Sequence, residues 1–114
     1  MKETQLLKGV LDGCVLQIIS KKEIYGYELI QDLRESGFDT MTGGTVYPLL
    51  QKLEKKELIK GQLKTSLDGP DRKYFSLTPK GEQYLEAFWK QWQDLTIKVG
   101  RLNEMTNKGG KNDI

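Results

Sequence analysis

The sequence of 114 residues contains no histidine and only one cysteine, Cys14. Because histidine is absent and only one thiol is present, the usual zinc-binding sets cannot be assembled and an internal disulfide is excluded. The sequence also lacks a phosphate-binding loop, and its carboxylates lie scattered on polar helix faces. We therefore expect a protein that is not an enzyme and uses no cofactor. Cys14 lies within an apolar helical stripe, which predicts that it packs in the core.

Long apolar runs are missing as well. No stretch approaches the roughly 18 uninterrupted apolar residues of a membrane span, and the N-terminus lacks the apolar run of a signal peptide. We therefore expect a cytoplasmic protein with no membrane partner. A chain of this length suits one domain, with one further element left for association.

Net charge is low for the whole chain, at +2, but it is unevenly distributed. Between Thr40 and Lys80, eight basic side chains oppose four acidic ones, whereas acidic residues exceed basic ones by two in the remainder. Charge distribution matters more for recognition than its sum. The middle of the chain is therefore the part suited to a polyanionic partner.

The first predicted helix spans about residues 6–20, where apolar residues recur at i, i+3, i+4 and i+7. Gly9 and Gly13 weaken this helix by about 1 kcal/mol each relative to alanine. Either the helix begins near Gly9, or these glycines permit close packing of another helix.

Two shorter helices are predicted next. One covers residues 25–35, with Gly37 as its C-terminal stop. The other is expected from residue 44 to about 56, with Thr42 as its N-cap, because Pro48 is tolerated only within the first turn or so.

A β-hairpin and a long helix complete the chain. Residues 59–67 and 73–78 read as two strands, joined by the turn residues Asp-Gly-Pro-Asp. Thr78 and Pro79 then provide a cap and a first-position proline for a helix whose apolar residues are spaced by three and four, as in a coiled-coil seam. The seam residues are Leu85, Phe88, Trp92, Leu95, Val99 and Leu102.

This order of elements predicts a mainly α fold with a small β-hairpin: a winged helix-turn-helix followed by a long, coiled-coil-like dimerisation helix. We divide the chain into a DNA-binding domain (residues 1–78), a C-terminal dimerisation helix (79–106) and a disordered tail without an apolar face (107–114). In such a fold the third helix enters the major groove, and the hairpin lies along the adjacent backbone or minor groove.

Polar and basic side chains remain on the outer face of the third helix once its apolar residues are turned inward. Hydroxyl, amide and ammonium groups suit base edges and phosphates, and a wing places its cations near phosphates. For any single lysine, a merely solvated helix face is an equally good interpretation. The predicted DNA contacts are Thr45, Tyr47, Gln51, Lys52, Lys55, Lys64, Arg72 and Lys73.

Three sequence blocks carry a family resemblance. They are YGYELI (residues 25–30), GTVYPLLQKLEKKELI (44–59) and GPDRKYFSLTPKG (69–81). In order and spacing they resemble the signature blocks of PadR-type regulators, in the smaller branch with a single C-terminal helix. Relatives usually have glycine where this chain has Glu57, which leaves the backbone geometry of that turn open.

The resemblance implies a homodimeric regulator that binds double-stranded DNA in a sequence-specific way. By analogy it would repress transcription from a palindromic operator, with contacts from the region around Tyr47 and from Arg72 and Lys73 in the wing. The alternative is a winged-helix module for protein–protein interaction, without specific DNA binding.

The resemblance also implies that the ligands of such proteins, where they exist, are often flat and aromatic. Trp92, with Trp89 and Phe88, would then bind a small aromatic effector at the dimer centre by stacking. Large aromatic side chains at a seam more commonly fill the interface, and this is the interpretation we favour.

Overall fold

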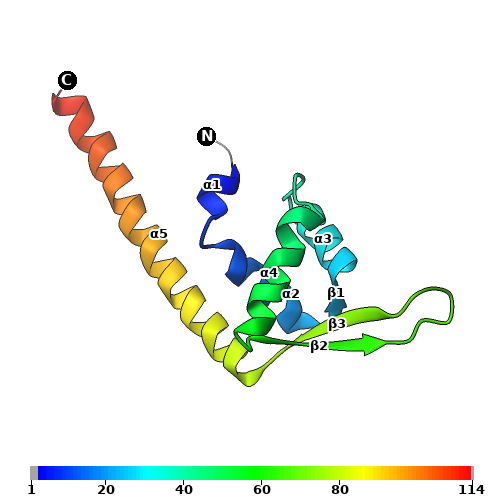
Figure 1. Ribbon diagram of the computed structural model, residues 1–114. Coiled ribbons are helices and arrows are strands. Elements are labelled where there is room, and N and C mark those ends of the chain that lie inside the picture. The colour runs from blue at the N-terminus through cyan, green and yellow to red at the C-terminus, as the bar shows by residue number, and fades with distance from the viewer. Residues whose placement is uncertain (1–2, 114) are drawn as a thin grey trace.

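The computed structural model describes the backbone of residues 3–113 and, apart from residues 4 and 106–113, their side chains. It is an elongated molecule of 67 × 29 × 20 Å, in which a small helical body carries two projections (Figure 1). The elements are α1 (Glu3–Leu7), α2 (Leu11–Lys21), β1 (Ile24–Tyr25), α3 (Gly26–Glu35), α4 (Gly43–Lys55), β2 (Ile59–Lys64), β3 (Arg72–Leu77) and α5 (Pro79–Asp113).

The core lies where α2, α3 and α4 meet one end of the sheet. Leu29 and Leu33 bury the inner face of α3, and Tyr27 points outward with 60% of its surface exposed. Gly37 has φ +110°, the left-handed conformation expected of a helix stop. The predicted inner face of α4 is confirmed, since its four apolar residues are all buried: Val46, Leu49, Leu50 and Leu53.

The first predicted helix is two helices. Gly9 adopts φ +89°, which a helix cannot continue through, and separates α1 from α2. Both alternatives left open for the glycines are confirmed: α2 begins just after Gly9, and Gly13 lets Phe88 of α5 pack closely against α2. Within α2, Cys14 is half-buried, and burial raises the pKa of its thiol above the ordinary value.

Helix α4 begins at Gly43, directly after Thr42, which occupies the N-cap position without a side-chain capping bond. Pro48 is consequently the sixth residue of the helix and lies in its second turn, one residue further into the helix than expected. An interior proline costs about 3 kcal/mol. Burial of the four apolar side chains of α4, at about 1.5–3 kcal/mol each, is large enough to offset that cost.

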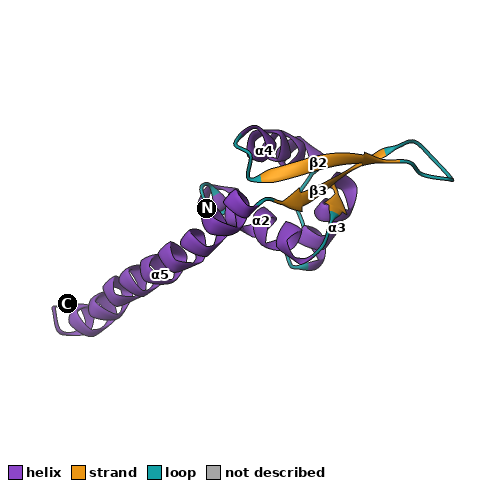
Figure 2. Ribbon diagram, turned by 90° about the horizontal axis from the view of Figure 1, so that it is seen from below, coloured by secondary structure: helices purple, strands orange, loops and turns teal. Residues whose placement is uncertain are grey.

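The sheet has three antiparallel strands in the order β1-β3-β2, where the sequence predicted two. Strand β1 is only two residues long, and Ile24 pairs with Phe75 of β3. The hairpin of β2 and β3 is confirmed, with register from Ile59 opposite Leu77 to Lys64 opposite Arg72. Its far end forms a wing that projects from the body beside α4 (Figure 2).

A compact corner joins the end of α4 to the start of α5. Glu57 turns the chain with φ +63°, so it adopts the left-handed geometry that glycine would favour. The Thr78 hydroxyl donates to the Glu57 carbonyl (2.7 Å) and accepts from the Gly81 N–H (2.9 Å), which confirms Thr78 as the cap. A side chain at Gly81 would lie 2.1 Å from the Leu58 carbonyl oxygen, so only glycine fits there.

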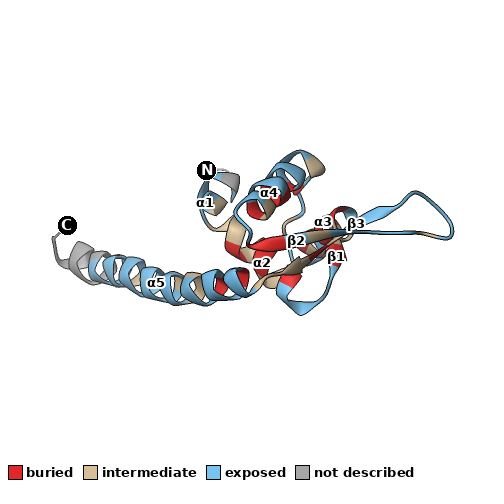
Figure 3. Ribbon diagram, turned by 60° about the horizontal axis from the view of Figure 1, so that its bottom comes forward, coloured by how far each residue is buried: buried red, intermediate tan, exposed pale blue. Residues whose placement is uncertain are grey.

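Helix α5 starts on the body and then extends away from it (Figure 3). Leu85 is buried in the protomer's own core, and Phe88 packs against that core. These two residues are therefore not free to form the predicted dimer seam, which is left with the positions from Trp92 onward. The helix continues to Asp113, beyond the expected boundary at residue 106. An established helix adds one hydrogen bond per residue, so lack of an apolar face does not end it. Of the expected disordered tail, residue 114 lies outside the described residues.

Candidate nucleic-acid interface

All eight predicted DNA contacts lie at the surface, on α4 and on the two wing strands. Because Leu50 and Leu53 fix one face of α4 in the core, Tyr47, Gln51 and Lys55 are turned to solvent. Figure 2 shows α4 next to the wing strands, with α5 extending away from both. An exposed helix flanked by a hairpin is the geometry that reads a major groove and follows the adjacent backbone.

Tyr47 connects the two helices of the helix-turn-helix. Its ring lies over two glycines: a Cβ at Gly26 would be 2.4 Å from the ring, and one at Gly43 would be 2.8 Å from it. The side chain nevertheless keeps 48% of its surface exposed. Tyr47 is therefore positioned by packing against the starts of α3 and α4, and the outer edge of its ring is exposed to solvent.

A groove of about 320 Å³ separates α4 from the wing strand β3. Gln51 and Glu54 line it from α4, and Arg72 and Lys73 line it from β3. Aromatic side chains form much of the remaining wall: Tyr25, Tyr27, Tyr47 and Phe75. Four of the eight predicted contacts thus border one shared groove: Tyr47, Gln51, Arg72 and Lys73. The other four do not line it, and Thr45 and Lys52 line a separate pocket.

Cations of the wing rest on aromatic rings. The Arg72 guanidinium lies 4.6 Å from the centre of the Tyr25 ring, and the Lys64 ammonium lies 4.9 Å from that of Tyr74. The two tyrosines meet edge to face, with ring centres 5.3 Å apart. Such contacts contribute about 0.5–1 kcal/mol at exposed sites, so they orient the cations without burying them.

Three of the predicted DNA-contacting lysines are paired with carboxylates that the sequence analysis did not identify. Lys52 Nζ lies 3.0 Å from an oxygen of Asp12, and Lys73 Nζ lies 2.7 Å from one of Glu54. Lys64 pairs with Glu23. Since each partner comes from a different segment of the chain, local sequence carried no signal for these pairs.

Arg72 and Lys55 differ from these lysines. Within the described residues neither has a carboxylate partner, and both are exposed. Among the predicted DNA contacts they are therefore the cations most available to phosphates.

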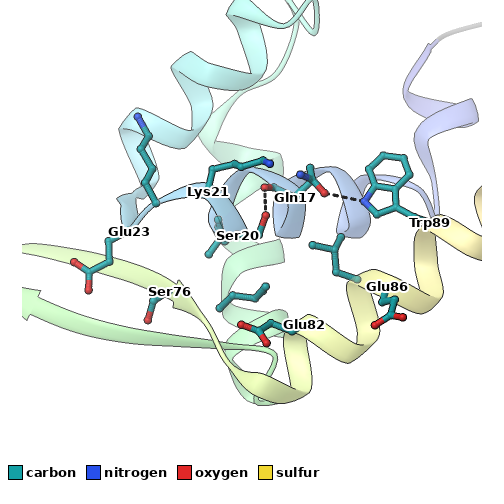
Figure 4. Close-up of a pocket in the computed structure, with 12 residues that line it drawn as sticks. Gln17, Ser20, Lys21, Glu23, Ser76, Glu82, Glu86 and Trp89 are labelled. Atoms are coloured by element: carbon teal, nitrogen blue, oxygen red, sulfur yellow. Dashed lines mark hydrogen bonds between the residues drawn. The ribbon is translucent and has the colours of Figure 1, made fainter.

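The three aromatic residues considered for an effector are not equivalent. Phe88 and Trp89 meet edge to face at 5.1 Å and both pack against the core. The Trp89 indole N–H donates to the Gln17 side-chain oxygen at 2.8 Å, which ties α5 to α2 (Figure 4). Trp92, on the next turn, is half-buried. Two of the three candidate residues thus serve the protomer's own packing.

Next to Trp89 lies an open pocket of about 470 Å³ between α2, β3 and α5. Figure 4 shows Glu82 and Glu86 at its rim. Trp92 is not among its lining residues, so this pocket is distinct from the cavity predicted between two copies of Trp92. Among the residues that the structure describes, no helix combines the length and the apolar character needed to cross a membrane.

Comparison with known proteins identifies the family. The profile described as "Transcriptional regulator PadR-like family" matches residues 15–87, more than half of the chain. The crystal structure of a Streptococcus transcriptional regulator is 62% identical, covers 89% of this chain and 99% of that chain, and has a TM-score of 0.80. The structure of a PadR-like transcriptional regulator from Bacillus cereus is 48% identical, covers 86% and 95% of the two chains, and has a TM-score of 0.78.

A protein of Lysinibacillus sphaericus is 34% identical over 97 residues, which cover 83% of this chain and 89% of its own. The family profile spans α3, α4 and both wing strands, the elements that form the groove described above. The expected mainly α winged-helix fold with a long C-terminal helix also agrees with the solved relatives. The chain therefore belongs to the PadR-like family of transcriptional regulators.

Proposed function

We propose that this protein is a transcriptional repressor that binds a palindromic operator as a homodimer. The observation that carries the proposal is the shared groove: the exposed face of α4, with Tyr47 and Gln51, and the wing residue Arg72 border one concave surface. With α4 in the major groove, Arg72 would lie near the phosphate backbone beside it. Lys55 would add a second phosphate contact from the end of α4.

The dimer is proposed to form along α5. Beyond Trp92 the helix has left the body, and Leu95 and Val99 expose 53% and 56% of their surfaces. These residues continue a three-and-four spacing, which buries such side chains when a second copy packs alongside. A symmetric dimer would present two copies of α4, and this accounts for the proposed palindromic operator.

Repression is the regulatory effect we propose, because a small dimer bound across promoter DNA excludes other proteins from the same site.

Binding of an aromatic effector would depend on Trp92 at the proposed interface, since the Trp89 indole is already hydrogen-bonded to Gln17. We favour the simpler role for Trp92, which is to fill the interface between the two α5 helices.

Selection from a pool of random duplex DNA tests this proposal. The purified protein should enrich an inverted repeat whose half-sites lie about one helical turn apart, or a multiple of it. Enrichment of a single half-site would refute the symmetric dimer. No enrichment at all would refute specific DNA binding and favour a module for protein–protein interaction.

A further inference from the structure

We propose that Glu54 is a specificity-determining residue: by holding Lys73 in an ion pair inside the groove, it suppresses binding to DNA that lacks the operator. The inference rests on the proposed DNA-binding function. Glu54 carries a negative charge, which is the opposite of the charge expected on a DNA-reading surface.

Glu54 lies on the reading face of α4. It follows Tyr47 and Gln51 by seven and three residues, which places all three on one side of the helix. All three line the groove. A carboxylate at this position repels the phosphates of DNA, which is unfavourable on a face that reads DNA.

The carboxylate is occupied by Lys73. One oxygen of Glu54 lies 2.7 Å from Lys73 Nζ, and the ammonium also lies 5.5 Å from the centre of the Phe75 ring. The two side chains remain 33% and 47% exposed, so the pair is accessible to ions and to DNA. The pair links the recognition helix directly to the wing.

The backbone leaves room for this pair at Gly61 of β2, which is opposite Phe75 in the sheet. A Cβ at Gly61 would lie 2.3 Å from Lys73 Cε and 2.8 Å from the second oxygen of Glu54. The space above Gly61 is therefore filled by the ion pair, and any side chain at that position would displace it.

The consequence for DNA binding follows from counterion release. Non-specific affinity grows with the number of cations that reach phosphates, and each phosphate contact changes the slope of log K against log salt by about 0.9. While Lys73 is paired with Glu54, it is not one of the cations that reach DNA phosphates. In the operator complex the base contacts fix the register of the protein on the DNA, and the Glu54–Lys73 pair stays closed there. A phosphate contact from Lys73 would therefore add mainly to non-specific binding, and the restraint raises the ratio of specific to non-specific affinity.

The test compares Glu54→Gln with wild type on operator DNA, once selected, and on random duplex of equal length, at several salt concentrations. We expect Glu54→Gln to bind random DNA several-fold more tightly, with a salt slope steeper by about one, and to lose several-fold in specificity ratio. The double variant Glu54→Gln/Lys73→Gln should return to the wild-type slope.

Two further variants separate local geometry from overall charge. Glu86→Gln adds the same net charge and breaks an exposed pair with Lys90 on α5, so it should leave the specificity ratio unchanged. Gly61→Ala displaces the pair without changing charge and should steepen the slope for random DNA.

Equal changes for Glu54→Gln and Glu86→Gln, or an unchanged slope in Glu54→Gln, would overturn the proposal. Loss of operator binding in Glu54→Gln, with random-DNA binding unaltered, would also overturn it and indicate that Glu54 reads a base. If wild-type protein shows no preference for any DNA sequence, the proposed function fails first, and the variants are then not needed to decide it.

Discussion

The ring of Phe88 lies directly against the backbone of Gly13, so close that a Cβ at Gly13 would be 2.2 Å from Phe88 Cε2. This contact brings α5 onto α2, and the Trp89–Gln17 hydrogen bond lies beside it on the same two helices. The direction in which α5 leaves the body is therefore set by the protomer itself. In the proposed dimer, this direction fixes the distance between the two copies of α4.

Gly13→Ala is expected to lower the free energy of unfolding by about 1–3 kcal/mol, because the new methyl group must displace the Phe88 ring. Denaturant titration measures the change. Helix propensity alone would favour alanine by about 1 kcal/mol, so a net gain in stability would contradict the close contact. Gly44→Ala is the matched control, since a Cβ at that position meets its nearest neighbour at an ordinary 3.6 Å.

Glu57→Gly should stabilise the protein by about 0.5–1 kcal/mol, because glycine adopts the observed φ of +63° without steric cost. The measurement is the shift in thermal denaturation midpoint. Glu57→Ala removes the carboxylate but retains the strain, and it should show no such gain. An equal gain in both variants would assign the effect to charge instead of backbone conformation.

Tyr47→Phe is expected to reduce operator affinity by roughly two- to tenfold, the range for loss of one hydrogen bond. The ring would remain over Gly26 and Gly43, so the thermal midpoint should stay near that of wild type. Tyr47→Ala should weaken operator binding further and also destabilise the fold, because it empties that space. Wild-type affinity in Tyr47→Phe would show that the hydroxyl makes no contact with DNA.

Arg72→Ala should weaken binding to operator and random DNA by similar factors and reduce the salt slope by about one, as expected for a phosphate contact. Arg72 has no carboxylate partner within the described residues, so its removal leaves no uncompensated charge. Titrations at several salt concentrations measure both quantities. A loss confined to the operator would mean that Arg72 contacts a base.

Leu95→Glu or Val99→Glu should convert the protein to a folded monomer with poor operator affinity, because both side chains lie on the proposed seam of α5. Sedimentation velocity gives the oligomeric state. Ile97→Glu is the matched control: Ile97 is similarly exposed, at 54%, but lies on the side of α5 opposite the seam, so this variant should leave the dimer intact. A dimer that persists in both seam variants would place the interface elsewhere.

The sequence predicted the fold class because its signals are local and periodic. The apolar spacing of α4, the turn residues of the wing and the cap at Thr78 each act within a few residues. Strand β1 escaped prediction because two residues have no periodicity, and its existence depends on pairing with Phe75, far along the chain. The break at Gly9 was also ambiguous, because glycine permits either a kink or a close helix contact.

The candidate site could be predicted only in outline. Composition placed cations on α4 and the wing, but which of them are paired depends on the tertiary arrangement that brings Asp12 to Lys52 and Glu54 to Lys73. The spacing of the α5 seam likewise did not distinguish Leu85, which the protomer buries itself, from later positions that remain exposed.

The most direct test of the central claim is a mobility-shift titration on the DNA immediately upstream of the protein's own gene, against random duplex, at two salt concentrations. We expect a discrete complex on the upstream DNA, at least 10³-fold tighter than on random duplex and weakened steeply by salt. Equal affinity for both DNAs, on this fragment and on any site recovered by selection, would contradict sequence-specific DNA binding.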